Sequence, residues 1–495
     1  MQPTPCLARA AAALVVSAAL GGCSLVPPDE VPPVALTAGW KTSAAPPDWI
    51  DAAAAASWQA GRWWELFDDA QLDALILQVE VGNQTLARAA ANVAQAEALL
   101  RQAQAQPWPT LGLQLGQQRS GRPTHGSASL GLVASWAPDV WGRLDAAVQA
   151  QGALVQASQA DLAAARLTAQ GGLAQAYFAL RETDAAAALL DEIIVGYRRV
   201  ALITGNRYEA GIAARTDLLQ AQSTLESALA GRIALQRSRE TYEHAIALLI
   251  GQPPAAFTLR VQAQWRAVVP AVPPQLPAQL LLRRPDIASA ERAVAAANAN
   301  IGVARGAYFP AINLSAGVGG GAETLAQVAS APTLAWALGL AVAQTLFDAG
   351  ARSAAVDAAR AAHAAAAATY RQTALTAFAQ VEDQLSALAT LAAQRVHARA
   401  AADAAAGAEE RLMNSYQAGT ADFTAVVTAQ ATTLNALRSV LQLQLEQQQA
   451  VVVLIQALGG GWQAPWPPGS TAPSAAASPA ASAGAAQDQG RPAVD

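Results

Sequence analysis

Apolar positions along the chain follow two periods, and the longest stretches have the period of a helix. No proline occurs between Pro138 and Pro253, and proline in a helix interior costs about 3 kcal/mol. The pattern predicts a helix from Gly142 to about Ile203, roughly 90 Å long at about 1.5 Å per residue. Small apolar residues recur along it every seven positions, as in a coiled coil, at Val148, Val155, Leu162, Ala169 and Ala176.

A turn and a second long helix follow, and the chain contains this unit twice. Ile203-Thr204-Gly205-Asn206 and then Gly211 predict the turn, because glycine and asparagine tolerate left-handed backbone. A shift of 208 positions, the difference between Gly142 and Gly350, superimposes the hairpin 142–251 on 350–459. The shift also brings Tyr208-Glu209-Ala210-Gly211 onto Tyr416-Gln417-Ala418-Gly419. Taken alone, these hairpins are compatible with a plain helical bundle or a filament-like coiled coil.

Four shorter segments alternate apolar and small or polar residues with period two, which predicts strands with one buried face. A helix from Trp63 to about Gln106 precedes the first pair of strands, and a helix from Arg283 to about Phe309 precedes the second. Each repeat thus reads as helix, two strands and two long helices. The predicted strands are Thr110 to Gln117, Ala128 to Trp136, Ala311 to Val318 and Leu334 to Gln344.

The number of strands constrains how they could enter a membrane. Four strands cannot close a barrel, since the smallest membrane barrels have about 8, and an open edge in lipid leaves backbone groups unpaired. A membrane location therefore requires oligomerisation, with eight strands in a dimer and twelve in a trimer. The alternative is a small soluble sheet packed on the helices.

The beginning of the chain has the features of an export signal. Arg9 precedes the apolar core Ala10 to Leu20, which is too short to span a membrane. Leu20-Gly21-Gly22-Cys23 resembles a bacterial lipobox, so Cys23 is expected to become the lipidated first residue of the mature protein. Ser24 favours the outer membrane. The alternative is a chance cysteine after an ordinary signal.

Composition excludes several classes of function. The 495 residues carry a formal net charge of −5 with no basic patch, which argues against nucleic-acid binding. No apolar run is long enough for a membrane-spanning helix. The sequence has no nucleophile elbow or phosphate-binding loop, so we expect no enzyme, metal or cofactor. The four histidines have no metal-ligand spacing: His125, His244, His363 and His397.

The expected organisation is linear. A signal peptide, 1–22, is followed by a lipidated tether, 23–62, and a first repeat, 63–252. A linker, 253–282, leads to a second repeat, 283–462. The last segment, 467–495, is rich in Ala, Ser and Pro and is expected to be disordered.

Several motifs resemble the outer-membrane factors of the TolC/OprM type, in their NodT-like lipoprotein branch, over about Trp63 to Trp462. The twin Tyr-x-Ala-Gly turns and the lipobox belong to this resemblance. The other motifs are Trp64, Phe67, Leu72 and Leu75, then Arg284-Pro285-Asp286-Ile287 with Glu291, Phe309-Pro310, and Phe347-Asp348-Ala349-Gly350.

The resemblance implies a homotrimer with one twelve-stranded β-barrel in the outer membrane and a twelve-helix periplasmic tunnel. Such a trimer would dock with a periplasmic adaptor protein and an inner-membrane pump of the proton-driven RND class. It would act as a passive exit duct for drugs or other small toxic compounds. Two alternatives remain: the outer channel of a type I protein-secretion system, and a periplasmic coiled-coil lipoprotein without a pore.

The resemblance also implies roles for particular residues. The adaptor-docking tips would be Tyr208, Glu209, Ala210 and Gly211 together with Tyr416, Gln417, Ala418 and Gly419. The periplasmic gate would lie at about Asp217, Thr424 and Thr428. The family usually has a carboxylate where Thr428 stands, so we expect a gate with weaker charge repulsion and weaker cation binding. The alternative is that Asp217 is a solvated surface aspartate.

Overall fold

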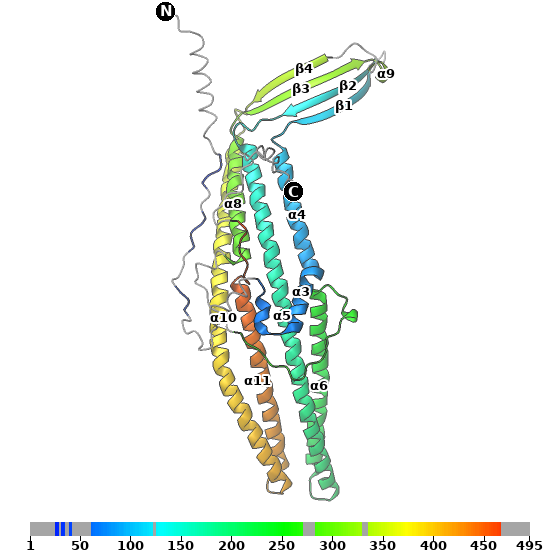
Figure 1. Cartoon of the computed structure of the whole chain (residues 1–495), viewed down its shortest axis with the longest axis vertical. Helices are drawn as coiled ribbons and strands as arrows, with labels where there is room; N and C mark the ends of the chain where they lie inside the picture. Colours follow the sequence, from blue (N-terminus) through cyan, green and yellow to red (C-terminus); the bar gives the residue numbers. More distant parts are fainter. Residues whose placement is uncertain are drawn as a thin grey trace, which may run out of the picture.

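The chain is elongated, with a small sheet at one end and long helices that run from it to two helix turns at the other end (Figure 1). The computed structural model describes residues 25–28, 31–34, 39–41, 61–121, 125–270, 283–328 and 335–466. The signal peptide, Cys23, most of the tether, part of the linker and the tail 467–495 lie outside the described residues.

The strands form one antiparallel sheet in the order β1-β2-β3-β4. Their bounds are β1 Thr110–Ser120, β2 His125–Trp136, β3 Ala311–Ala322 and β4 Ala335–Ala343. Leu113 pairs with Leu132, Leu132 with Val318, and Val318 with Trp336. One face of the sheet is therefore apolar across all four strands, as the alternation predicts. β1, β2 and β3 extend beyond their predicted bounds because backbone pairing continues past the alternating residues.

The two long hairpins have matching dimensions. α5 (Arg143–Glu209) and α10 (Ala351–Gln417) each have 67 residues, and α6 (Arg215–Leu249) and α11 (Phe423–Ala457) each have 35. The predicted end of the first helix near Ile203 is wrong, because α5 continues for six residues to Glu209. Gly205 and Asn206 stay helical, and the left-handed backbone is at Gly211, with φ 71°.

The single helix predicted from Trp63 to Gln106 is also wrong. The structure has a 3₁₀ turn η1 (Trp63–Phe67), α3 (Ala70–Gly82) and α4 (Gln84–Ala105). The side chain of Asp69 accepts hydrogen bonds from two backbone N–H groups at the start of α3, and Asn83 does the same for α4. These caps start new helices and end the old ones.

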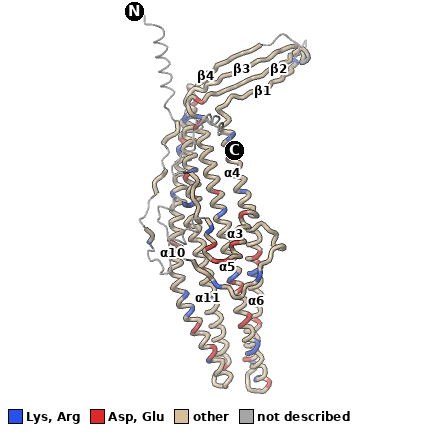
Figure 2. The backbone as a smooth tube through the Cα atoms, viewed as in Figure 1, with Lys and Arg blue, Asp and Glu red and all other residues tan. Residues whose placement is uncertain are grey.

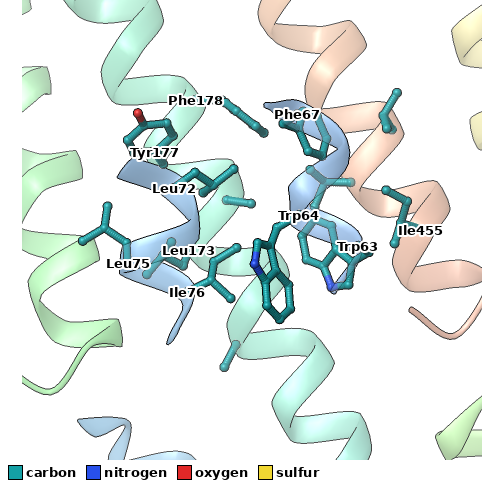
Figure 3. Close-up of a cluster of buried hydrophobic side chains, with 14 of the residues drawn as sticks. Trp63, Trp64, Phe67, Leu72, Leu75, Ile76, Leu173, Tyr177, Phe178 and Ile455 are labelled. Atoms are coloured by element: carbon teal, nitrogen blue, oxygen red, sulfur yellow. The ribbon is translucent and has the colours of Figure 1, made fainter. Parts of the chain in front are cut away.

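The helices pack around α5 and α10. α8 (Pro285–Gly306) contacts both of them in the half near the sheet, and α11 contacts both in the half near the turns. The main core lies midway along the molecule, at the level of α3, and we call this region the waist (Figure 1). There Trp63, Phe67 and Leu72 pack against Tyr177 and Phe178 of α5 (Figure 3). The core continues with Val451, Val452, Leu454 and Ile455 of α11 and with Leu458, which follows this helix. A short turn η2 (Pro254–Ala256) and a short helix α9 (Leu325–Val328) complete the described elements.

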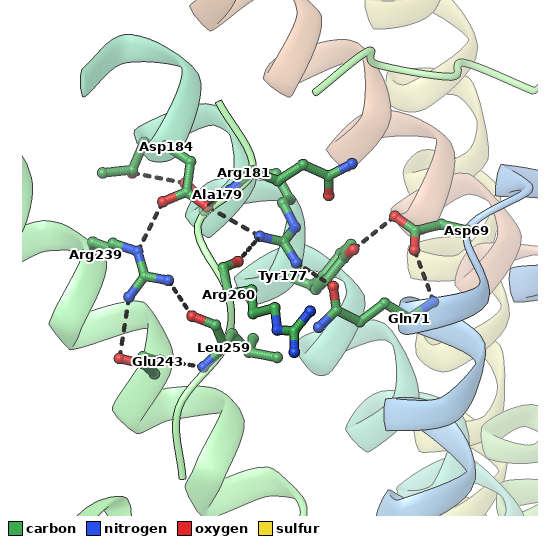
Figure 4. A network of polar contacts seen from close by, with 12 residues as sticks. Asp69, Gln71, Tyr177, Ala179, Arg181, Asp184, Arg239, Glu243, Leu259 and Arg260 are labelled. Atoms are coloured by element: carbon green, nitrogen blue, oxygen red, sulfur yellow. Dashed lines mark hydrogen bonds and ion pairs between the residues drawn. The ribbon is translucent and has the colours of Figure 1, made fainter. Parts of the chain in front are cut away.

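A buried polar network ties the segment after η2 to the waist (Figure 4). Arg181 is fully buried and donates hydrogen bonds to Asp184 at 3.0 Å and to the carbonyl oxygen of Arg260 at 2.9 Å. Asp184 also accepts from Arg239 at 2.8 Å. Burial and the hydrogen bond to Asp69 raise the pKa of Tyr177 well above its usual range. The network therefore supplies partners for charges that would be costly to bury alone.

Charges are distributed unevenly along the molecule (Figure 2). The four strands contain no Asp, Glu or Lys, and Arg119 is their one arginine. Charged residues instead follow the helices down to the turns. Within the part of the chain that the structure describes, no helix is both long and apolar enough to cross a bilayer.

Candidate functional site

The two helix turns lie at the end of the molecule opposite the sheet (Figure 1). Glycine takes a left-handed conformation in each turn, with φ 71° at Gly211 and 79° at Gly419. Most predicted docking residues are exposed there: Glu209, Ala210, Gly211, Gln417, Ala418 and Gly419. The two equivalent tyrosines differ, since Tyr208 is 38% exposed and Tyr416 only 4%. The two turns thus present different side chains at their surface.

Tyr416 is held inside the chain by α5. The guanidinium of Arg207 lies 4.7 Å from the centre of the Tyr416 ring and donates a hydrogen bond of 3.2 Å to the Tyr416 carbonyl oxygen. The hydroxyls of Thr204 and Tyr416 are 3.4 Å apart. Arg207 and Thr204 therefore join the two hairpins near the turns. The repeat gives no signal for the role of Arg207, because the equivalent residue in the second repeat is Ser415.

An apolar cluster completes this junction. Val200 of α5 and Ala221 of α6 pack in one buried cluster with Tyr416, Phe423 and Val426 of the second hairpin. All five side chains are buried, with exposures between 0% and 5%. The tip of the second hairpin therefore packs against the first hairpin.

A groove with a volume of about 500 Å³ lies between α10 and α11. Two of the predicted gate residues, Thr424 and Thr428, line it, and Asp217 is not among its lining residues. The Thr428 hydroxyl donates to the carbonyl oxygen of Thr424 at 2.9 Å, so the methyl group of Thr428 is left to form the groove wall. The lining comprises Ala405, Ala408, Leu412, Asp422, Thr424, Ala425, Thr428, Ala429 and Thr432.

Asp217 lies in the first turn of α6 and is half-buried. Its backbone N–H donates to the carbonyl oxygen of Ala214 at 3.1 Å, which leaves the carboxylate close to the positive end of the helix dipole. The three residues predicted as a gate thus lie at the starts of two equivalent helices, α6 and α11.

A second hollow, of about 300 Å³, separates the two hairpins on the side of α5 and α10. Its lining includes Arg199 of α5, Glu409, Glu410 and Met413 of α10, and Gln430 of α11. Charges of both signs beside a polarisable methionine are suited to contact with another protein.

The described part of the tether runs along α8 towards the waist. Arg305, in the last turn of α8, donates to the carbonyl oxygen of Leu25 at 3.3 Å, and Asn298 donates to that of Pro27 at 2.9 Å. The backbone N–H of Lys41 reaches Glu382 of α10 at 2.6 Å. The first described residue, Leu25, therefore lies at the sheet end of α8.

No group of three or more His, Cys, Asp or Glu side chains within the described residues could hold a metal ion. In the buried network around Arg181, the carboxylates of Asp184 and Glu243 are paired with arginines. This arrangement stabilises the fold and offers no open coordination site.

Comparison with known proteins agrees with this geometry. A family model described as "Outer membrane efflux protein" matches residues 75–252 and 276–460. The pyoverdine export outer membrane protein OpmQ of Pseudomonas aeruginosa is 33% identical over 441 residues, which cover 85% of this chain and 92% of that protein. The toluene efflux pump outer membrane protein TtgI of Pseudomonas putida is 30% identical over 454 residues, which cover 90% and 96%.

The structure of the outer-membrane channel OprN superimposes with a TM-score of 0.79 at 29% identity and covers 89% of this chain and all of that one. The names of these relatives describe export channels. The TolC/OprM-type resemblance is confirmed, and the chain belongs to the outer membrane efflux protein family.

Proposed function

We propose that three copies of this chain close their sheets into one twelve-stranded β-barrel in the outer membrane, above a tunnel of twelve helices. The trimer would be the passive exit duct of a tripartite efflux system. The observation that carries the proposal is the sheet itself. Its outermost strands, β1 and β4, have no further strand beside them among the described residues, and its apolar face is open.

The exposure of that face supports a lipid environment. Leu111 and Leu113 of β1 are 73% and 70% exposed, and Trp336 and Leu338 of β4 are each 75% exposed. An exposed apolar surface of this kind marks an interface with lipid or protein. The unpaired edges add the requirement for closure, because open edges are not stable in lipid.

The opposite face of the sheet supports a duct with little charge selectivity. It carries small or uncharged residues, including Gln114, Ser129, Gly131, Ser315 and Gly317. A barrel lumen lined in this way would pass solutes of either charge. The relatives named for pyoverdine and toluene export support a small exported compound as the cargo.

Two substitutions in β4 test the barrel. Arginine at a lipid-facing position costs about 2–4 kcal/mol at the bilayer midplane, whereas a lumen position tolerates it. We expect Leu338→Arg to abolish assembly of the trimer, measured as the light-scattering mass of the detergent-solubilised protein. Ala337→Arg, on the opposite face, is the matched control and should assemble. A monomeric wild-type protein, or equal behaviour of the two variants, would contradict the proposal.

The turns are proposed as the docking site for a periplasmic adaptor protein. Efflux proteins of this family work with such an adaptor and an inner-membrane transporter, here proposed to be of the RND class. The exposed residues of the two turns and the mixed-charge hollow at Glu409 support this role. A photo-crosslinker attached to cysteine at Ala210 or Ala418 should capture the co-expressed adaptor, and the same label at Ser386, an exposed residue near the middle of α10, is the control.

The gate and the anchor are separate parts of the proposal. We expect Asp217→Asn to lower cation selectivity and raise open probability in single-channel recordings, since three carboxylates would leave the pore mouth. Unchanged recordings would remove Asp217 from the gate and leave Thr424 and Thr428 as its proposed members. For the anchor, Cys23→Ser should abolish incorporation of labelled palmitate.

A further inference from the structure

A further hollow, of about 440 Å³, lies at the waist beside the segment that follows η2. This segment is tied to α5 by the backbone N–H of Gln262, which donates to Asp184 at 3.1 Å. It is tied to α11 by the Gln448 amide, which donates to the carbonyl oxygen of Val268 at 2.9 Å. The start of α3 also contributes to the lining. Pockets for small organic ligands have volumes of about 300–1,000 Å³, so the hollow is large enough to be a binding site.

Four glutamines line this hollow, which we call the waist pocket. A glutamine amide carries an acceptor oxygen and two donor hydrogens. Asp68 and Asp69 add carboxylates to the lining, and Trp265 adds an indole ring. The pocket therefore offers donors and acceptors together with one large flat apolar surface. The glutamines are Gln71, Gln262, Gln264 and Gln448.

Gln448 contributes a buried acceptor without a partner. Its side chain is 1% exposed, and its Oε1 accepts no hydrogen bond from any described residue. The hydrogen bond from its amide nitrogen to Val268 sets the orientation of the amide and leaves Oε1 for a donor in the pocket. A buried acceptor that stays unpaired is costly, so a ligand that donates a hydrogen bond here would be favoured.

Three further groups of the waist pocket are available to a ligand. Asp68 and Arg266 are exposed and Trp265 is half-buried. Over the part of the chain that the structure describes, the Asp68 carboxylate, the Arg266 guanidinium and the indole N–H of Trp265 form no hydrogen bond. The pocket thus combines a buried acceptor with both donors and acceptors nearer its surface.

Three classes of ligand fit this arrangement poorly. A metal ion needs open carboxylates, but both oxygens of Asp69 already accept hydrogen bonds from protein groups. An anion would pair with Arg266 but would also lie beside the carboxylates of Asp68 and Asp69. An apolar ligand would leave the amides unpaired. An uncharged ligand with several hydroxyl groups fits, because each hydroxyl both donates and accepts.

We propose that the waist pocket binds a sugar unit of a glycan chain. The apolar face of the sugar ring would pack on the indole of Trp265, and ring hydroxyls would pair with Asp68 and Gln264. A hydroxyl or the N–H of an acetamido group would donate to Oε1 of Gln448. This binding goes beyond the proposed function and does not depend on it, because all groups of the pocket belong to one chain.

The location of the pocket indicates two sources for such a sugar. The helical part of an outer membrane efflux protein extends into the periplasm, and the waist lies midway along the molecule (Figure 1). The cell wall there is built on chains of N-acetylated sugars, and free oligosaccharides share the same ring chemistry. A surface pocket at this height can receive either one.

Binding of a fluorescent N-acetylglucosamine tetramer to the full-length protein in detergent tests the pocket, with fluorescence anisotropy as the readout. Gln448→Met should weaken binding about tenfold, because the acceptor is lost while the length of the side chain is kept. The matched control is Gln447→Met, which should bind like the wild type. Gln447 is also buried, and its Oε1 likewise has no partner among the described residues, but it does not line the pocket. No binding by the wild type, or equal weakening in both variants, would overturn the proposal.

A substitution at the surface makes the test independent of the packing around Gln448. Gln264 is exposed and lines the pocket, so Gln264→Ala should melt at the temperature of the wild type and bind the tetramer about threefold more weakly. Gln252→Ala, at an exposed glutamine that does not line the pocket, is the control. Equal affinities of these two variants would overturn the contact assigned to Gln264.

Cosedimentation with isolated cell-wall sacculi separates the two sources of the sugar. Cosedimentation of the wild type that is weaker for Gln448→Met would support the cell-wall glycan. Binding of the tetramer without cosedimentation would support the pocket, overturn the cell wall as the source and assign a free oligosaccharide. Neither measurement depends on the mass of the trimer, so failure of the sugar site would leave the proposed function intact.

Discussion

In both halves of the chain, the glycine that follows the second hairpin helix packs against a backbone carbonyl just before the helix that leads to the strands, but the side chains around this contact differ. In the first half, Gly251 has φ 75° and its α-carbon lies against the carbonyl of Gly82. In the second half, Gly459 has φ 88° and lies against the carbonyl of Arg283. A side chain at either glycine would overlap that carbonyl oxygen. The glycines are therefore fixed by backbone geometry, which both halves share.

The hydrogen bonds beside these glycines show what is free to change. The Asn83 amide donates to the carbonyl oxygen of Leu249 at 2.8 Å, and the Arg284 guanidinium donates to that of Ala457 at 3.0 Å. Leu249 and Ala457 differ by the same 208 positions as the repeat. Any donor of suitable reach can satisfy the carbonyl at a helix end. The donor therefore differs between the two halves, Asn83 in one and Arg284 in the other, whereas the glycine is the same in both.

The first prediction breaks the feature that both halves share. Gly251→Ala and Gly459→Ala should each destabilise the protein by about 3–4 kcal/mol, as a left-handed alanine and a steric overlap act together. The controls are Gly211→Ala and Gly419→Ala, which have positive φ but nothing within 4 Å and should cost about 1–2 kcal/mol. Denaturant midpoints of the four variants measure the difference. Equal losses would show that the close contact contributes nothing.

The second prediction concerns a feature of the first half alone. Arg181 and Asp184 have Ala389 and Ala392 as equivalents in the second half, where no described segment corresponds to Leu259–Gln262. Arg181→Met should cost about 3–5 kcal/mol, because Asp184 would lose a buried partner. Arg232→Met, which removes an exposed pair with Asp191, should cost less than about 1 kcal/mol. A small loss for Arg181→Met would mean that Arg239 alone satisfies Asp184.

The third prediction sharpens the contrast between the turns. Arg207→Ala removes a cation from the Tyr416 ring and a hydrogen bond, together about 1–2 kcal/mol, which corresponds to a rise of about tenfold in open probability. Ser415→Ala, at the equivalent position, should leave gating unchanged. Single-channel recordings of the two variants make the comparison. A closed channel in Arg207→Ala would show that the internal junction does not contribute to gating.

The sequence predicted the parts of the fold that depend on local periodicity. Alternation located all four strands, and the missing prolines located the long helices, because both signals lie in consecutive residues. The break at Asn83 was not predictable in this way, since it depends on capping and on the approach of Gly82 to Gly251 across 169 positions. Gly205 was likewise mistaken for the turn, although Gly211 is the residue with left-handed backbone.

The same limit applies to the candidate site. The twin Tyr-x-Ala-Gly motifs located both turns, yet one tyrosine is buried and the other exposed. The cause is Arg207, whose partner Tyr416 is 209 residues away in sequence. A motif repeated in sequence therefore indicates equal backbone and not equal side-chain environment.

The last prediction has the smallest effect and concerns Asp73, in the first turn of α3. Burial and the negative charges of Glu65, Asp69 and Asp68 raise the pKa of this carboxyl above its usual range. The folded state therefore binds the proton more tightly than the unfolded chain. The stabilising contribution of the protonated Asp73 carboxyl is fully present below about pH 4, the pKa of aspartate in the unfolded chain. It is lost as the pH rises through the raised pKa of the folded state.

Asp73→Asn should therefore raise the melting temperature at pH 7 relative to the wild type, and the difference should shrink towards pH 4. The equivalent change at an exposed aspartate, Asp357→Asn, serves as the control. A melting temperature for Asp73→Asn that tracks the wild type at both pH values would contradict the cost assigned to the ionised carboxylate. The cost of ionising Asp73 is confined to the first half of the chain. There Asp68 and Asp69, which raise the pKa of Asp73, also end η1 and start α3, so this cost is a consequence of the capping that separates the two elements.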